Sequence, residues 1–304
     1  MESKLIDFSN EELIDEYMGY FMHSPQSQDN RRSALKYFFR EDHYNYQDHV
    51  STITTSILKK YFNWLKNLDG ISIATKKNKW TLLISFLNST MEDYNEFLIK
   101  IPTKSVDWRG ASGNGKIMKD ILTKEEITKI LDYFKRYNFK HYIIFRLLTE
   151  TGMRKGELIS AKVHNIDIQK RYIRTHGKTE ESVYYFSKEL GKYINSYLNS
   201  RLNINVNSDV LFLSQFRKQF SNRTFNLLLK NACVQVGITK NITCHTFRRT
   251  INTFRKKMGC SNEDRKILLN HKVQDVNIES YIILDREEYL KLFDQFNPYQ
   301  ELTL

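Results

Sequence analysis

The sequence has few cysteines, few glycines and no long apolar run, and each shortage excludes a class of protein. Its three cysteines, Cys233, Cys244 and Cys260, are an odd number without the spacing of a metal site. This pattern predicts reduced thiols inside the cell rather than a disulfide framework. A membrane span needs about 20 apolar residues, and no such run occurs. The acidic N-terminus lacks the basic and apolar regions of a signal peptide, so we expect a cytoplasmic protein that does not enter a membrane.

Two kinds of catalytic signature are also missing. A metal-dependent nuclease needs carboxylates clustered with a histidine, whereas the acidic clusters "EESVYY" (180–185) and "SNEDRK" (261–266) are typical of solvated surface. The chain also has no G-x-x-x-x-G-K-[ST] loop of the kind that holds nucleotide phosphates. We therefore expect no metal ion and no other cofactor.

Acidic charge is in short supply as well. Lys and Arg number 47 against 35 Asp and Glu, which gives a net charge of +12. The two signs nearly balance in residues 1–105, so the surplus falls on residues 106–304. A basic surplus favours a polyanionic partner, because each neutralised phosphate releases condensed counterions. Within the first part, residues 31–79 are rich in basic residues, and Lys76, Lys77 and Lys79 at the head of a helix are candidate nucleic-acid contacts.

The scarce glycines indicate where the chain divides. Only 11 occur, and Gly110, Gly113 and Gly115 lie close together in "DWRGASGNGK". This cluster predicts a flexible linker over residues 103–117. The linker would join an N-terminal domain, residues 1–102, to a larger domain, residues 118–304.

Apolar spacing predicts a mainly α fold with a small antiparallel β-sheet. Ser9 with Glu12 forms a capping box, and four helices are expected near residues 8–100. Thr123 with Glu126 forms a second box in the larger domain. Further helices are expected there at about 140–152, 154–162, 187–200, 220–236, 245–259, 261–270 and 285–296. The alternating segments "VHNIDIQ", "RYIRTH" and "SVYYFS" predict a three-stranded meander among them.

The helix at 245–259, "HTFRRTINTFRKKMG", has two distinct faces. An apolar stripe repeats at the helical period and comprises Phe247, Ile251, Phe254 and Met258. His245, Arg248 and Arg255 fall on the neighbouring stripe. A solvated cationic face would explain this stretch as well as a catalytic face would. The choice between these two interpretations depends on motifs elsewhere in the sequence.

Separated motifs resemble, in order, the tyrosine recombinase (phage integrase) family. They are "TGMRKGEL" with Arg154, a hairpin tip with Lys178, "HTFR" with His245 and Arg248, "LNH" with His271, and then Tyr281. The resemblance covers roughly residues 120–285. It implies a recombinase catalytic domain over 118–304 and a helical core-binding (SAM-like) DNA-binding domain over 1–102. It also assigns the six named residues to catalysis.

Phosphodiester cleavage without a metal needs residues of these types. Two guanidiniums, Arg154 and Arg248, can clamp the non-bridging oxygens. A tyrosine nucleophile such as Tyr281 needs an acceptor for its proton, which suits His245 supported by His271. Lys178 could protonate the departing 5′ oxygen.

The sequence departs from the family pattern at two places. Asn270 stands where the family usually has glycine, and Tyr281 follows His271 by ten positions where nine is usual. Tyr289 is therefore the alternative nucleophile. The amphipathic tail that carries Tyr289 could complete its own domain or dock on a neighbouring protomer.

The resemblance implies a site-specific recombinase of the Xer-like or simple integrase type. It would bind a duplex DNA recombination site and act as a homotetramer on paired sites. It would cleave and rejoin DNA through a 3′-phosphotyrosyl intermediate. Two alternatives stay open: a catalytically inactive DNA-binding protein on the same scaffold, and a type IB topoisomerase-like enzyme.

Overall fold

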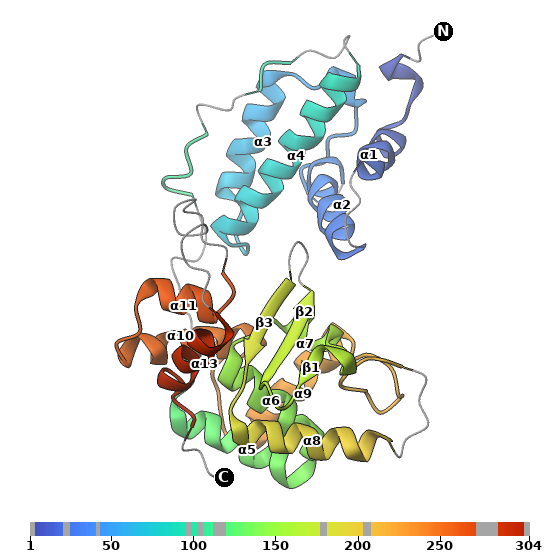
Figure 1. Ribbon diagram of the computed structural model, residues 1–304. Coiled ribbons are helices and arrows are strands. Elements are labelled where there is room, and N and C mark those ends of the chain that lie inside the picture. The colour runs from blue at the N-terminus through green and yellow to red at the C-terminus, as the bar shows by residue number, and fades with distance from the viewer. Residues whose placement is uncertain are drawn as a thin grey trace. The chain divides into compact units, whose positions relative to one another are not determined.

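The chain folds into two compact units, Met1–Met118 and Lys119–Leu304, which are described separately as the N-terminal and the C-terminal unit (Figure 1). The computed structural model describes residues 4–20, 25–40, 43–94, 99–101, 106–111, 120–176, 181–202, 208–271 and 285–300. In these residues, no helix has the length and apolar character that crossing a membrane requires.

The described residues of the N-terminal unit contain the four helices that the sequence predicts. Its described elements are η1 (Leu5–Asp7), α1 (Asn10–Gly19), α2 (Pro25–Phe39), η2 (Val50–Thr52), α3 (Thr55–Asn67) and α4 (Ile73–Asp93). The capping box is present, because the Ser9 hydroxyl accepts the Glu12 N–H at 3.2 Å and the Glu12 carboxylate accepts the Ser9 N–H at 2.7 Å. Helix α4 contacts α1, α2 and α3, and an aromatic-rich core that includes Phe38, Tyr61 and Phe86 fills the space among them.

The C-terminal unit is helical with one small sheet, as the sequence predicts. Its described helices are α5 (Lys124–Tyr137), α6 (Phe139–Thr151), α7 (Lys155–Ser160), α8 (Lys188–Leu202), α9 (Asn222–Gln235), α10 (Cys244–Lys257), α11 (Asn262–Leu268) and α13 (Arg286–Gln295), with the 3-10 turn η3 (Val163–Asn165). Strands β1 (Ile166–Asp167), β2 (Tyr172–His176) and β3 (Glu181–Tyr185) pair antiparallel in that order. Ile173 of β2 lies opposite Tyr184 of β3.

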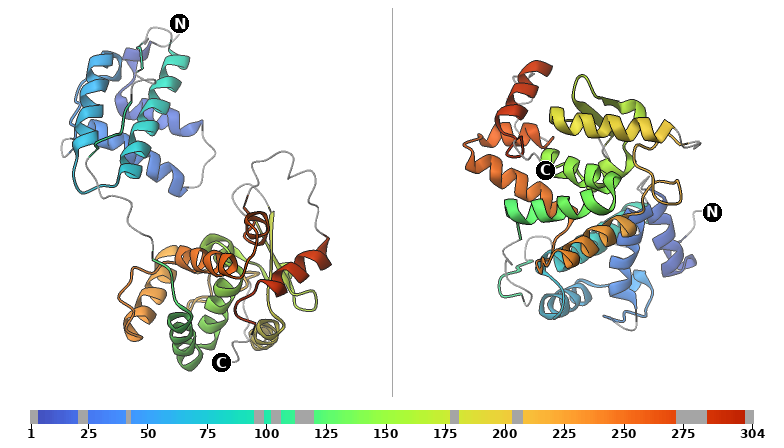
Figure 2. Two further views of the ribbon diagram at one scale, coloured as in Figure 1. Left: turned by 90° about the vertical axis from the view of Figure 1, so that its left-hand side faces the viewer. Right: turned by 90° about the horizontal axis from the view of Figure 1, so that it is seen from below.

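Helix α6 is the centre of the C-terminal unit. All its residues from Tyr142 to Thr151 are buried, and the helix contacts α5, α7, α8 and α10 (Figure 2). A helix buried on every side cannot drift relative to its neighbours without opening the core. The residues that follow its end, including Gly152 and Arg154, therefore start from a fixed point.

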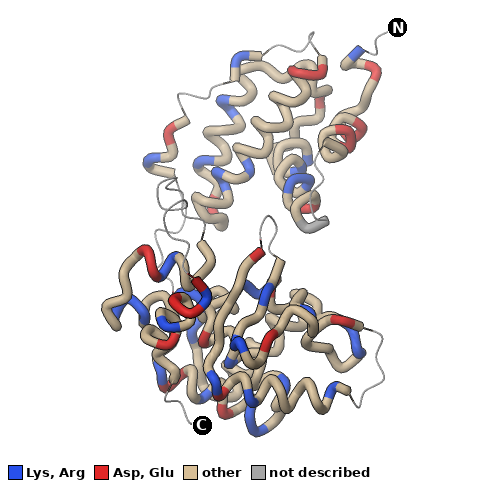
Figure 3. The backbone as a smooth tube through the Cα atoms, in the orientation of Figure 1, with Lys and Arg blue, Asp and Glu red and all other residues tan. Residues whose placement is uncertain are grey.

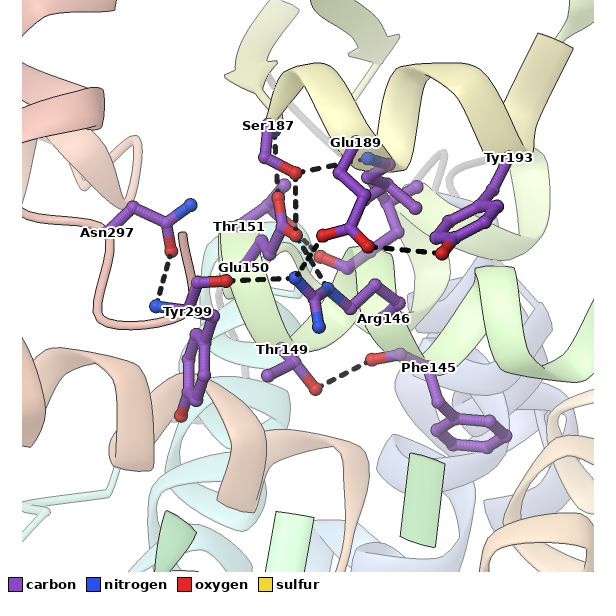
Figure 4. A network of polar contacts seen from close by, with 12 residues as sticks. Phe145, Arg146, Thr149, Glu150, Thr151, Ser187, Glu189, Tyr193, Asn297 and Tyr299 are labelled. Atoms are coloured by element: carbon purple, nitrogen blue, oxygen red, sulfur yellow. Dashed lines mark hydrogen bonds and ion pairs between the residues drawn. The ribbon is translucent and has the colours of Figure 1, made fainter. Parts of the chain in front are cut away.

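A buried polar network ties α6 to distant parts of the unit (Figure 4). The Arg146 Nε donates to a Glu150 carboxylate oxygen at 2.7 Å, and its Nη2 donates to the Tyr299 carbonyl at 2.9 Å. The Ser187 N–H and hydroxyl donate to the same carboxylate at 2.8 and 2.9 Å. A buried charge pair is tolerable only when such bonds satisfy its remaining polar atoms. The start of α8 and the segment after α13 are thus fastened to α6.

Helix α13 packs against its own unit. Phe293 is buried with Tyr185, Cys260 and Leu268. The Asp294 carboxylate accepts hydrogen bonds from both Nη1 and Nη2 of Arg171. The amphipathic tail thus completes its own domain in this structure, which is the first of the two arrangements considered from the sequence. All three cysteines are buried and free of disulfides.

Candidate active site

The turn between α6 and α7 requires a glycine at position 152. Gly152 caps α6 in the left-handed region, with φ of 67°, which L side chains rarely adopt. A Cβ there would also come within 2.8 Å of both Ile251 Cγ2 and Leu269 Cδ2. The turn can therefore pack directly on α10 and on the end of α11, and it delivers Arg154 two residues later.

Arg154 is the N-cap residue of α7 and is held by Glu157. The Glu157 carboxylate accepts the Arg154 N–H at 2.8 Å and the Arg154 guanidinium at 2.8 Å. The Tyr184 hydroxyl donates to the same carboxylate at 2.8 Å. Burial, followed by the Glu157 charge, raises the pKa of Tyr184 to about 12. The Arg154 side chain is 49% exposed, whereas Glu157 is 3% exposed. The buried carboxylate therefore orients the arginine while much of its side chain stays accessible to solvent.

Arg248 lies on α10, and its side chain is buried. Its Nη1 donates to the Gly152 carbonyl at 2.8 Å, and its Nη2 donates to the Leu269 carbonyl. A guanidinium carries five N–H donors, so these bonds fix its orientation without using all of them. The sequence predicts a cationic stripe that contains Arg248. In the structure, Arg248 and Arg255 of this stripe are buried and bond carbonyls at the ends of α6 and α11, whereas His245 is exposed.

His271 follows α11 at a turn that Asn270 shapes. Asn270 has φ of 48°, a conformation that asparagine and glycine tolerate best. Its side chain also pairs with Val183 of β3, accepting the N–H at 3.3 Å and donating to the carbonyl at 2.9 Å. Asn270, where the family usually has glycine, therefore adopts a backbone conformation that glycine also tolerates, and its side chain adds a link to the sheet.

Hydrogen bonds place Arg248 close to the segments that carry Arg154 and His271, because its guanidinium bonds the carbonyls of Gly152 and Leu269, which precede those two residues by two positions. The His271 imidazole is exposed in part, and its pKa is lowered first by desolvation and then by the charges of Arg248, Arg154 and His245. His245 is exposed in the first turn of α10, one turn before Arg248. The structure thus brings together residues from α7, α10 and the end of α11.

Lys178 and Tyr281 lie outside the described residues. Lys178 falls between β2 and β3 along the chain, and Tyr281 falls between His271 and α13. Tyr289, the alternative nucleophile, is described. Its hydroxyl donates to the Ile267 carbonyl at 2.8 Å, and burial raises its pKa. Both features make the Tyr289 phenol a poor nucleophile.

Helix α4 is one of several helices that carry basic residues (Figure 3). The prediction that all three of its candidate lysines contact nucleic acid requires a correction. Lys76 is fully buried and its ammonium donates to the Lys66 carbonyl at 2.8 Å. Lys79 is also buried, with its ammonium 3.1 Å from the centre of the Tyr37 ring, and burial lowers its pKa to about 8. Only Lys77 of the three is exposed. Lys76 and Lys79 therefore do not form the surface that phosphate contacts need, because their stems and ammonium groups pack into the N-terminal unit.

Comparison with known proteins shows the family to which the chain belongs. The model of the Phage integrase family matches residues 120–285, more than half of the chain. The chain belongs to the phage integrase family. This confirms the resemblance seen in the sequence motifs. Among its family relatives, tyrosine recombinase XerD of Staphylococcus aureus is 24% identical over 310 residues, which cover 95% of this chain and 99% of that protein.

Solved structures share the fold of this phage integrase family member. The Tn1549 transposon integrase in complex with transposon right end DNA aligns with a TM-score of 0.70 at 16% identity, over 93% of this chain and 98% of that one. A lambda integrase tetramer bound to a Holliday junction aligns with a TM-score of 0.63 at 18% identity, over 92% of this chain and 78% of that one.

Proposed function

We propose that this protein is a site-specific tyrosine recombinase, which cleaves and rejoins duplex DNA through a 3′-phosphotyrosyl intermediate. The observation that carries the proposal is the convergence of Arg154, Arg248 and His271 from separate elements of a phage integrase family chain. Its relative of nearly the same length is a tyrosine recombinase by name. The DNA-bound integrase structures that share its fold are consistent with a DNA partner.

The two arginines would stabilise charge on the scissile phosphate. The Arg154 side chain is half exposed while its guanidinium bonds Glu157, and Arg248 is oriented by two backbone carbonyls. Guanidiniums held in advance lose little freedom when the non-bridging oxygens gain charge, which favours the transition state over the ground state.

The two histidines would manage the proton of the nucleophile. Tyrosine has an ordinary pKa of about 10, so the attacking phenol needs an acceptor near neutral pH. The lowered pKa of His271 favours the neutral form of its imidazole. We assign His245 the accepting role and His271 a supporting one, with Tyr281 as the nucleophile. Lys178 would protonate the departing 5′ oxygen, since a hairpin tip can reach across a bound strand.

The remaining parts of the proposal concern assembly and setting. The N-terminal unit would serve as the core-binding domain, with Lys77 as a candidate phosphate contact. The lambda integrase tetramer supports a homotetramer on paired sites. We place the protein in the cytoplasm. The phosphotyrosyl bond would conserve the energy of the cleaved phosphodiester, so strand exchange should persist in EDTA and without a nucleotide.

A trapped covalent adduct tests the function directly. The wild-type protein first selects its site from a pool of randomised duplexes, and the selected duplex is then nicked beside the cleavage position so that the short product strand is lost. We expect the adduct to accumulate with wild type, to map to Tyr281, and to vanish in Tyr281→Phe while DNA binding survives. Tyr289→Phe is the matched control and should still form the adduct. Adduct in Tyr281→Phe but not in Tyr289→Phe would contradict our assignment.

The same substrates separate the alternatives. An inactive DNA-binding protein would select a duplex and never form an adduct. A type IB topoisomerase-like enzyme would relax supercoiled plasmids that lack the selected site as fast as those that carry it, whereas a recombinase should act only on the latter.

A further inference from the structure

Helix α10 carries a second buried arginine that the proposed reaction does not use. Arg255 follows Arg248 by seven residues, or about two helical turns, so both lie on the same face of α10. Arg255 is 0% exposed. Its Nη2 donates to the Glu150 carbonyl at 3.1 Å and its Nη1 to the Leu268 carbonyl at 3.5 Å.

The two arginines bind neighbouring carbonyls of the same two segments. Arg248 takes the carbonyls of Gly152 and Leu269, whereas Arg255 takes those of Glu150 and Leu268. Each arginine therefore bridges the end of α6 to the end of α11. These ends lead, within a few residues, to Arg154 and His271.

Helix ends suit a cation because their last carbonyls lack partners within the helix and carry partial negative charge. Even so, burying a guanidinium is expensive, and among the described residues no carboxylate forms an ion pair with Arg255. The Glu150 carboxylate is bonded to Arg146 and Ser187 instead. Burial lowers the pKa of Arg255 to about 10, and its Nε has no hydrogen-bond partner among the described residues. An apolar side chain would fill this core position at lower free-energy cost. The presence of an arginine therefore calls for a function of its bonds to the two helix ends.

We propose that Arg255 is a positioning residue, which clamps the ends of α6 and α11 together so that the carbonyls of Gly152 and Leu269 orient Arg248 toward the scissile phosphate. The proposal rests on the proposed function for its effect on catalysis. The clamp itself is a property of the DNA-free protein and can be measured there.

Replacing Arg255 with methionine keeps a long apolar stem and removes the bridge. We expect Arg255→Met to bind the selected duplex within about twofold of wild type and to form adduct about a hundredfold more slowly at saturating DNA, because a displacement of about 1 Å in a catalytic group costs that much. In an Arg248→Ala background the same change should cost less than about twofold, since Arg255 acts through Arg248. Equal loss in both backgrounds would overturn the proposal.

Two further variants separate positioning from stability. Arg201→Met removes another guanidinium that bonds a backbone carbonyl, that of Ser208, beyond the end of α8, and it should form adduct at the wild-type rate. Arg255→Lys keeps the charge but offers one bonding centre for two carbonyls, so we expect about a tenfold slower reaction. If Arg255→Met fails to fold, Arg255→Lys decides: a wild-type rate there overturns the bridge.

The pKa of His271 provides a readout that needs no DNA. Its imidazole can be followed by NMR with labelled histidine, and the Arg248 charge lowers its pKa in the intact protein. We expect the pKa to rise in Arg248→Ala and also in Arg255→Met, but not in Arg201→Met. If wild type forms no adduct on any duplex, the proposed function fails, while this titration still decides the clamp. An unchanged His271 pKa in a folded Arg255→Met would refute it.

Discussion

Replacing Gly152 with alanine should destabilise the C-terminal unit through two separate effects. The residue has φ of 67°, and an L side chain in the left-handed region costs about 1–2 kcal/mol. The new Cβ would also stand 2.8 Å from Ile251 Cγ2 and from Leu269 Cδ2. Overpacking of this kind costs about 1–3 kcal/mol. We therefore expect the free energy of unfolding to fall by about 2–5 kcal/mol.

Two other glycines separate these effects. Gly237 has φ of 74°, but a methyl group added to its Cα would have no atom within 4 Å among the described residues, so Gly237→Ala should lose only the backbone part, about 1–2 kcal/mol. Gly156 lies within α7 with open space around it, and Gly156→Ala should gain about 0.5–1 kcal/mol.

Urea unfolding followed by circular dichroism measures the three changes. Tryptophan fluorescence serves as an internal control, because Trp64, Trp80 and Trp108 all belong to the N-terminal unit. Its midpoint should stay constant across the variants. If Gly152→Ala costs no more than Gly237→Ala, the close approach of this turn to α10 and α11 is refuted.

Two further predictions concern pH and the turn before His271. Burial, then the Lys140 charge, lowers the pKa of His141 to about 4, so the unfolded chain binds a proton that the folded one does not. The free energy of unfolding should fall by about 1–2 kcal/mol as pH drops from 6.5 to 4, after a discount for partial exposure. Urea titrations at several pH values measure this fall, which should disappear in His141→Gln and remain in His164→Gln. Asn270→Ala should cost about 2–3 kcal/mol of unfolding free energy by losing two bonds and a tolerated φ, whereas Asn270→Gly keeps the φ and should cost about 1 kcal/mol.

Local signals in the sequence were sufficient for most of the fold. The box at Thr123 and Glu126 predicted the start of α5, and in the structure the Thr123 hydroxyl accepts the Glu126 N–H at 3.2 Å. Helix caps, apolar periods and strand alternation act over a few residues, so they can be recognised without knowing the rest of the chain. The same holds for the short motifs on which the family resemblance rests, and the family match confirms that resemblance.

Burial of charged side chains was not predictable in this way. Lys76 and Lys79 belong to a basic stretch, yet both pack into the N-terminal unit, because their partners, the Lys66 carbonyl and the Tyr37 ring, come from other helices. A long aliphatic stem makes lysine amphipathic, so its sequence neighbours do not reveal which end meets the core. Nothing in the charge pattern distinguishes Lys77, which is exposed, from the other two.

Arg248 and Arg255 show the same limit at the site itself. The helical period places both on one stripe of α10, and from the sequence alone that stripe could equally be solvated. The two arginines are buried because they face two helix ends, whose carbonyls accept hydrogen bonds from them. For Arg248 these carbonyls belong to residues roughly a hundred positions earlier and about twenty positions later in the chain. Backbone carbonyls are present at every residue, so they leave no mark in the sequence. The orientation of a catalytic arginine can therefore depend on acceptors that only the fold reveals, and the glycine at 152 matters because it lets one of those carbonyls come close enough to be used.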